Sequence, residues 1–141
     1  MFWRKDLTMS NHETIISELH SYQGDIFREL TLPARGAAVS RVFRGSGIQS
    51  GTRIVAAALT DFVLKEGEHL MFELQEADSG KGPFFKRNVI ATVTGPKSYV
   101  PGDEIMRFSP EKGNRRFLRL RVSDNSDLSS SVITAYLVRK S

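Results

Sequence analysis

The last third of the chain constrains the fold most, because its hydrophobic pattern has the period of a β-strand. In residues 117–122, three aliphatic side chains alternate with one aromatic and two basic ones: Leu118, Leu120 and Val122 against Phe117, Arg119 and Arg121. Side chains alternate between the two faces of a strand, so this segment buries one face and exposes the other. Residues 132–138 are apolar or small on both faces, which is typical of a central strand covered on both sides. The polar residues 123–127 between them have turn chemistry, and the two segments predict a β-hairpin.

Further strand patterns precede this pair. Residues 53–64 are rich in aliphatic and alanine side chains, and in residues 70–75 large apolar side chains alternate with more polar ones. A β-branched run follows at residues 88–94, and a short apolar segment follows at residues 105–108. About seven strand candidates are thus separated by turn residues roughly every eight to twelve positions, which indicates an all-β sandwich or barrel. We assign residues 36–141 to this β-sandwich domain and residues 1–35 to an N-terminal arm or extension.

The arm carries a helix signal. Residues 10–13, Ser-Asn-His-Glu, match a capping box, in which the serine and glutamate side chains satisfy free amides at the start of a helix. Ile15, Ile16 and Leu19 then have helical spacing. This part of the arm therefore forms either a short helix or an extended segment.

The first residues bear on targeting and on association. Phe2, Trp3 and Arg4 stand together, and Trp3 is the only tryptophan of the chain. Trp3 docks either on its own domain or on a neighbouring molecule, since a chain end is ordered only when something ties it down. No apolar segment with a cleavage site follows, so we expect no signal peptide. No run of about 18 apolar residues predicts a transmembrane helix, and we expect no membrane partner.

Positive charge is concentrated in one region. The net charge is +4, and residues 107–123 hold six basic residues against one acidic residue. Three interpretations remain open: a solvated strand face, a contact with an acidic protein surface, and a nucleic-acid site. Few exposed aromatic residues are interleaved with the arginines as stacking platforms, so we expect no specific nucleic-acid partner.

The sequence lacks the motifs that are typical of enzymes and metal sites. It contains no Gly-x-Ser-x-Gly or His-Glu-x-x-His motif, and its single Gly-Ser-Gly stretch lacks the Lys-Ser/Thr pair of a phosphate loop. The absence of cysteine excludes disulfides and thiolate metal sites. The acidic pairs Glu66/Glu68 and Asp124/Asp127 are read as solvated turn residues rather than as acid–base or calcium ligands. We therefore predict no enzymatic activity, no catalytic residues, no cofactor and no metal.

Three stretches carry a resemblance to a known family. They are Arg53-Ile-Val-Ala-Ala-Ala-Leu-Thr60, Glu68-His-Leu-Met-Phe-Glu-Leu-Gln-Glu-Ala-Asp78 and the closing segment with Phe117-Leu-Arg-Leu120 and Thr134-Ala135. Together they resemble the jelly-roll head decoration proteins of tailed phages, which are also called capsid cement proteins. The likeness covers roughly residues 50 to 138, and its motifs are structural and degenerate rather than catalytic. The N-terminal fifty residues match the family poorly.

The resemblance implies a jelly-roll-like β-sandwich that works as a structural virion protein without chemistry of its own. Such a protein binds the outside of a phage head as a dimer or trimer, bridges major-capsid subunits and stabilises the shell. The implied partners are the phage major capsid protein and further copies of the chain, on the outer capsid surface of the virion and in the host cytoplasm during assembly. The candidate capsid or oligomer contacts are Phe2, Trp3, Arg4, Arg115, Arg116, Arg119 and Arg121.

A second interpretation is a β-sandwich binding module for carbohydrate or a host surface. Such modules present aromatic side chains on a face or a loop. The best candidates here are Phe84 and Phe85, which follow Gly82-Pro83. Core packing explains this pair as well.

Overall fold

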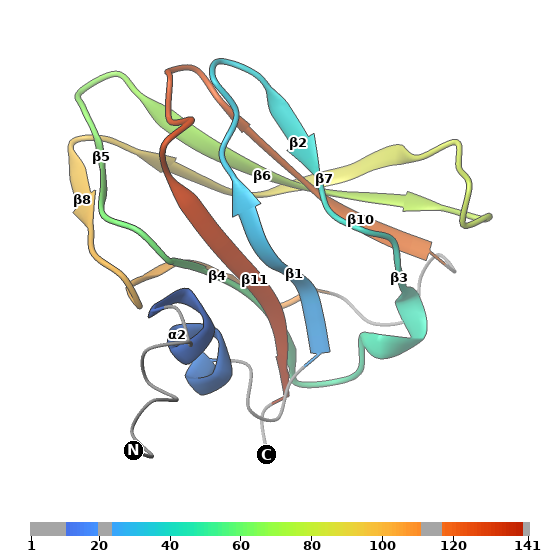
Figure 1. Ribbon diagram of the computed structural model, residues 1–141. Helices are drawn as coiled ribbons and strands as arrows, with labels where there is room; N and C mark the ends of the chain where they lie inside the picture. The colour runs from blue at the N-terminus through green and yellow to red at the C-terminus, as the bar shows by residue number, and fades with distance from the viewer. Residues whose placement is uncertain (1–10, 20–23, 111–116, 140–141) are drawn as a thin grey trace, which may run out of the picture.

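The computed structural model describes residues 11–19, 24–110 and 117–139 (Figure 1). Its elements are a short helix, one turn of 3-10 helix and eleven strands. They are α2 (Asn11–Leu19), β1 (Gly24–Thr31), β2 (Ala37–Val39), β3 (Phe43–Arg44), η1 (Gly45–Gly47), β4 (Thr52–Ala58), β5 (Phe62–Leu64), β6 (His69–Ala77), β7 (Phe85–Thr94), β8 (Lys97–Tyr99), β9 (Glu104–Phe108), β10 (Phe117–Asp124) and β11 (Val132–Arg139).

The strands form two main antiparallel sheets and a small ribbon. One sheet has the order β1-β11-β4-β9, and the other has the order β2-β10-β6-β7 with β3 also paired to β10. The chain changes sheet at most of its connections, so that strands distant in sequence become neighbours. This order, with β2 and β3 sharing one position along β10, is that of a jelly roll. The predicted all-β, jelly-roll-like sandwich is confirmed. β5 and β8 pair with each other at one end of it (Figure 1).

The predicted closing hairpin is wrong. β10 pairs with β2, β3 and β6, whereas β11 pairs with β1 and β4, so the two strands belong to different sheets. The polar residues between them cross from one sheet to the other instead of forming a tight turn. Alternation within a strand shows which side chains point inward, but it does not show which strand lies alongside.

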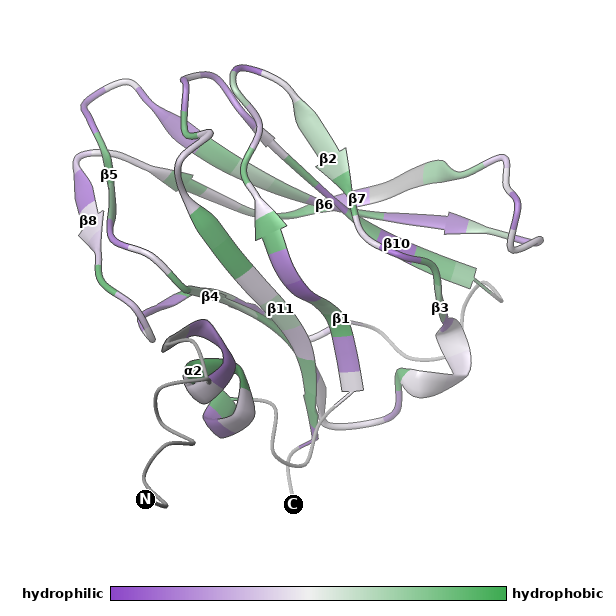
Figure 2. Ribbon diagram, in the orientation of Figure 1, coloured by the Kyte–Doolittle hydropathy of each residue, from purple (hydrophilic) through white to green (hydrophobic). Residues whose placement is uncertain are grey.

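The core lies between the two sheets and follows the predicted alternation. From the second sheet, Leu120 of β10 and Phe72 of β6 are fully buried; from the first sheet, Ile54 of β4 and Ile133 of β11 are fully buried. Burying one such side chain contributes about 1.5–3 kcal/mol. Figure 2 shows hydrophobic stretches along strands of both sheets. The segment 53–64, expected as one strand region, is divided into β4 and β5.

The first strand lies inside the segment that the sequence assigned to the arm. Gly24–Thr31 forms β1, at the edge of the first sheet, and pairs with β11 with two irregularities in register. At the second irregularity, the buried Thr134 hydroxyl donates a hydrogen bond of 3.1 Å to the carbonyl oxygen of Phe27. The threonine side chain thereby provides a hydrogen bond to a backbone carbonyl at a point where the regular hydrogen bonds between β1 and β11 are interrupted.

The helical alternative for the arm is confirmed by α2, while Ser10, the expected cap, lies outside the described residues. Leu19 packs against a small cluster of Val55, Ala57 and Tyr136, which is separate from the main core. These side chains belong to β4 and β11, and Figure 1 shows α2 outside the sheet, beside those strands. The last strand is therefore covered on both faces, as its composition predicted.

Gly95 gives a test of how tightly the β5–β8 ribbon joins the sandwich. A Cβ atom at this position would lie 2.0 Å from the carbonyl oxygen of Lys65 and 2.5 Å from that of Leu64. Because both contacts are with backbone, we expect Gly95→Ala to lower the free energy of unfolding by about 1–3 kcal/mol. Chemical denaturation measures this change. Gly24→Ala is the matched control, since its Cβ would meet only Leu137 Cδ1 at 3.9 Å; equal effects of the two substitutions would contradict the prediction.

Candidate functional site

The outer face of the β2-β10-β6-β7 sheet carries a row of charged, polar and aromatic side chains. β10 supplies Arg119 and Arg121 to this face because its aliphatic side chains point into the core. Across the strands, Gln75 lies opposite Arg119, and Glu73 lies opposite Arg121. We call this surface the arginine face and define it by the following residues: Val39, Glu73, Gln75, Phe84, Val89, Phe117, Arg119 and Arg121.

Arg119 is held from two directions. Its guanidinium carbon lies 4.2 Å from the centroid of the Phe84 ring, which is a cation–π contact. Its Nε donates a hydrogen bond of 2.6 Å to Gln75 Oε1, and Gln75 Nε2 donates one of 2.9 Å to Glu73 Oε2. The side chain of Arg119 is therefore fixed in orientation before any partner arrives.

Arg121 is held more loosely. Its Nη1 lies 3.8 Å from Glu73 Oε1, at the long end of the range for an ion pair. The Arg121 side chain is 37% exposed, whereas that of Glu73 is 11% exposed. A buried carboxylate needs pairing, and Glu73 has it from Gln75 and Arg121 together. The guanidinium of Arg121 keeps donors that can bind an acidic group of another molecule.

Apolar side chains flank this polar row. Val39 lies opposite Arg121 on one side and is 45% exposed, and Val89 lies opposite Glu73 on the other and is 39% exposed. At the end of β10, the guanidinium carbon of Arg44 lies 5.5 Å from the centroid of the Phe117 ring. Arginine, aromatic and aliphatic groups in one patch are typical of a protein–protein interface.

The structure tests the placement of only two of the seven candidate contacts. It brings Arg119 and Arg121 onto one face, together with Phe84, which the sequence had assigned to the carbohydrate interpretation. Phe85 is 58% exposed. Phe2, Trp3, Arg4, Arg115 and Arg116 lie outside the described residues. Sequence reasoning missed Glu73 and Gln75 as members of the face, although their alternation on the strand marked them as outward-facing.

Three of the four acidic residues considered for chemistry have hydrogen-bond partners for their carboxylates: Glu68, Asp124 and Asp127. The amide of His69 donates to Asn125 Oδ1, and Glu68 Oε1 accepts a hydrogen bond from the amide of Lys65 within a turn. Asp127 Oδ1 accepts hydrogen bonds from the amide and hydroxyl of Ser129, which lower the pKa of Asp127. Within residues 11–19, 24–110 and 117–139, no three His, Cys, Asp or Glu side chains form a group that could hold a metal ion. The helix in these ranges is too short to span a membrane.

Asp124 ties the loop after β10 to the connection between β1 and β2. Its Oδ1 accepts a hydrogen bond of 3.3 Å from the amide of Gly36, and its own amide donates to the Gly36 carbonyl oxygen at 3.0 Å. Its Oδ2 is buried without a hydrogen-bond partner, and so is the nearby Ser126 hydroxyl. Burial of the carboxyl raises the pKa of Asp124, and the amide of Gly36 opposes this in part.

The fold and the arginine face define the class of the protein: it is a jelly-roll β-sandwich with positioned arginine side chains on the outer face of one sheet. No protein-family model matches the sequence. The search of curated proteins likewise returns no match. Among solved structures, the chain is similar to a part of a Clostridium thermocellum xylanase chain, the N-terminal endo-1,4-beta-D-xylanase 10B with its CBM22-1 and GH10 modules, in complex with xylohexaose. The TM-score is 0.37 with 21% identity, over 73% of this chain and 19% of the xylanase chain. So distant a likeness carries no inference about ligand or activity.

Asp124 generates a prediction about pH. Because its folded-state pKa is raised, the folded chain keeps this proton to higher pH than the unfolded chain does, so the free energy of unfolding falls as pH rises through that interval. Asp124→Asn removes the buried charge and keeps an oxygen for the Gly36 amide. We expect it to stabilise the protein at pH 7 by on the order of 1 kcal/mol, and to lose this advantage below the ordinary carboxyl pKa of about 3.9. Denaturation at a series of pH values measures this.

Asp127→Asn is the matched control for Asp124→Asn. The pKa of Asp127 is lowered rather than raised, so the charged carboxylate favours the folded state. Replacing Asp127 with asparagine should therefore not stabilise the protein at pH 7. An Asp124→Asn protein that is less stable than the wild type at pH 7 would show that the carboxylate is needed in its charged form.

Proposed function

We propose that this chain is a structural binding protein of the capsid-decoration kind, which attaches to the outside of a phage head and bridges neighbouring major-capsid subunits. It does so without catalysis, by contacts between folded surfaces. The observation that carries the proposal is the arginine face, where Arg119 and Arg121 are positioned by Phe84, Gln75 and Glu73.

The construction of this face favours a protein partner over simple solvation. A solvated charge stripe has mobile side chains in water, whereas Arg119 is fixed by an aromatic ring and an amide. Exposed Val39 and Val89 border the charged groups, so a partner that covers the face removes apolar area from water as well. Two arginines against the single carboxylate of Glu73 leave the row with positive charge, which complements an acidic protein surface.

The placement of the family-like stretches also supports the proposal. The three stretches on which the resemblance depends lie on β4, on β6 and on β10 with β11. These are the inner strands of both sheets, so the likeness concerns the framework of the jelly roll. A framework that presents one sheet face with a defined pattern of side chains suits a protein that is added in many copies to a shell, where weak contacts combine by multivalency.

Carbohydrate binding is the second candidate function. The observation that favours it is Phe85, whose side chain is 58% exposed and therefore open to stacking on a sugar ring. Phe84 is less suited to that role, because Arg119 already covers its ring. A glycan-array signal that disappears in the Phe84→Ala, Phe85→Ala double variant would favour this function over decoration.

Cosedimentation with purified, expanded phage shells tests the decoration proposal. We expect the wild-type protein to pellet with the shells, and Arg119→Glu combined with Arg121→Glu to weaken this binding by about tenfold or more, because like charges would then face each other. Lys65→Glu combined with Lys97→Glu, on the β5–β8 ribbon and its turn, makes the same change in net charge and should bind as the wild type does. Binding that is equal in both double variants would rule out the arginine face as the contact.

A further inference from the structure

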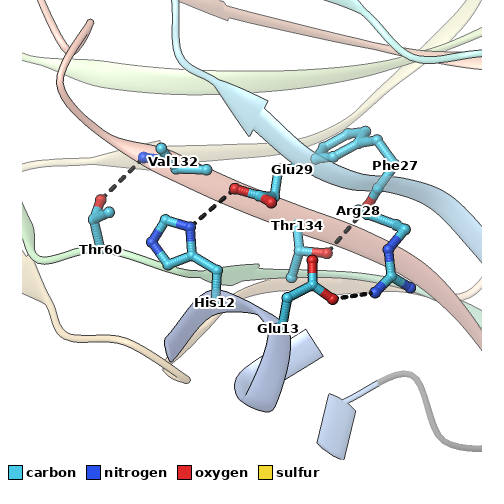
Figure 3. A network of polar contacts seen from close by, with 8 residues as sticks. All are labelled: His12, Glu13, Phe27, Arg28, Glu29, Thr60, Val132 and Thr134. Atoms are coloured by element: carbon cyan, nitrogen blue, oxygen red, sulfur yellow. Dashed lines mark hydrogen bonds and ion pairs between the residues drawn. The ribbon is translucent and has the colours of Figure 1, made fainter. Parts of the chain in front are cut away.

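The two outer sheet faces differ in how far they are covered. α2 covers part of the β1-β11-β4-β9 sheet, since its Leu19 packs against a small apolar cluster on β4 and β11. The helix also pairs with the edge strand, where Arg28 Nη2 of β1 donates to Glu13 Oε2 of α2 at 2.9 Å (Figure 3). The arginine face of the other sheet keeps two exposed valines. The arginine face is therefore the sheet face on which a partner can bury further apolar surface.

Four members of the arginine face form one row across the strands. Val39 of β2 is the register partner of Arg121 in β10. Further across the sheet, Arg121 lies opposite Glu73 of β6, and Glu73 lies opposite Val89 of β7. Neighbouring strands lie about 4.8 Å apart, so the row from β2 to β7 spans about 14 Å. It ends in an exposed apolar side chain on each side.

The positive charge lies near the middle of this row. Arg121 Nη1 is 3.8 Å from Glu73 Oε1, so the guanidinium leans from β10 toward β6, and these are the two inner strands of the row. The Arg121 side chain is 37% exposed and that of Glu73 is 11% exposed, so an incoming group meets the guanidinium first. Arg119 is already engaged by Gln75 and Phe84. The row thus offers one cation about halfway between its two valines.

An extended segment of a partner matches this spacing. Side chains at positions i, i+2 and i+4 of a strand share one face, and they lie about 7 Å and about 13 Å along it. Apolar side chains at i and i+4 then reach Val39 and Val89, while an acidic side chain at i+2 reaches Arg121. A helix fits less well, because its same-face positions i+7 and i+11 lie at about 10 Å and about 16 Å from position i.

We propose that the arginine face binds an extended segment of its protein partner, which crosses the strands of the row and carries the pattern apolar-x-acidic-x-apolar. The apolar side chains cover Val39 and Val89 and remove them from water. The carboxylate accepts charge-assisted hydrogen bonds from the Arg121 guanidinium. The inference rests on the proposed function, since it specifies the partner chemistry of the same face.

Titration of short peptides into the isotope-labelled full chain, followed by NMR, tests the pattern. The probe is capped Gly-Val-Ser-Glu-Ser-Val-Gly. One control replaces its glutamate with glutamine, and the other, Gly-Val-Val-Ser-Ser-Glu-Gly, has the same composition in another order. We expect the probe to shift the amide resonances of Val39, Val89 and Arg121, and to bind about fivefold or more tightly than either control.

Three variants assign the recognition to the row. Arg121→Gln should abolish the preference for the glutamate peptide over the glutamine peptide, because the cation is lost. Val39→Ser should weaken binding of the glutamate peptide several-fold. Val63→Ser, on β5 outside the row, removes a valine that is 53% exposed and should leave the affinity unchanged. The spectra of the free variants report whether each one is folded.

The shell experiment separates this inference from the proposed function. Equal affinity for all three peptides, together with shell binding that depends on Arg119 and Arg121, would overturn the pattern and leave decoration standing. Selective binding of the glutamate peptide by a protein that does not pellet with shells would support the pattern and overturn decoration as the function.

Discussion

The packing of the two inner sheet faces against each other is the interaction on which the remaining features depend. Phe72 and Leu120 from one sheet and Ile54 and Ile133 from the other are withdrawn completely from water, and they fix the sheets face to face. Because a strand gives only every second side chain to such a core, the other half is left for the outer faces. The chain uses its two outer faces differently. One is apolar and lies under α2, and the other carries the positioned arginines.

The strands could be predicted from the sequence because their signal is local, whereas their partners could not. The alternation of Leu118, Leu120 and Val122 depends only on neighbours in the chain, and all three are buried as expected. The false hairpin arose because nothing local shows that the residues after β10 bind elsewhere. There, the Ser126 carbonyl accepts from the amide of Arg35, and Asn125 Nδ2 donates to the carbonyl of Gly67.

β1 was missed for a related reason. Its sequence, Gly-Asp-Ile-Phe-Arg-Glu-Leu-Thr, has two adjacent apolar residues followed by two adjacent charged ones, and so it has no period of two. The register irregularities along β11 account for this, since each one shifts the following side chains relative to the sheet. The candidate site shows the same limit. The pattern of β10 alone identifies Arg119 as a residue of the outer face. Its neighbour Gln75 could not be predicted, because the two residues meet through pairing between strands far apart in the sequence.

The placement of the two special faces has a consequence for assembly. They lie on different sheets with the core between them, so a partner on one does not block the other. Two arginine faces held in one particle would engage a repetitive surface together, and the second contact would form at a high effective concentration. Contacts that are weak one by one would then be sufficient for stable attachment. Arg121 is an example, because it lies as far as 3.8 Å from Glu73 and can pair with an acidic group of a partner instead.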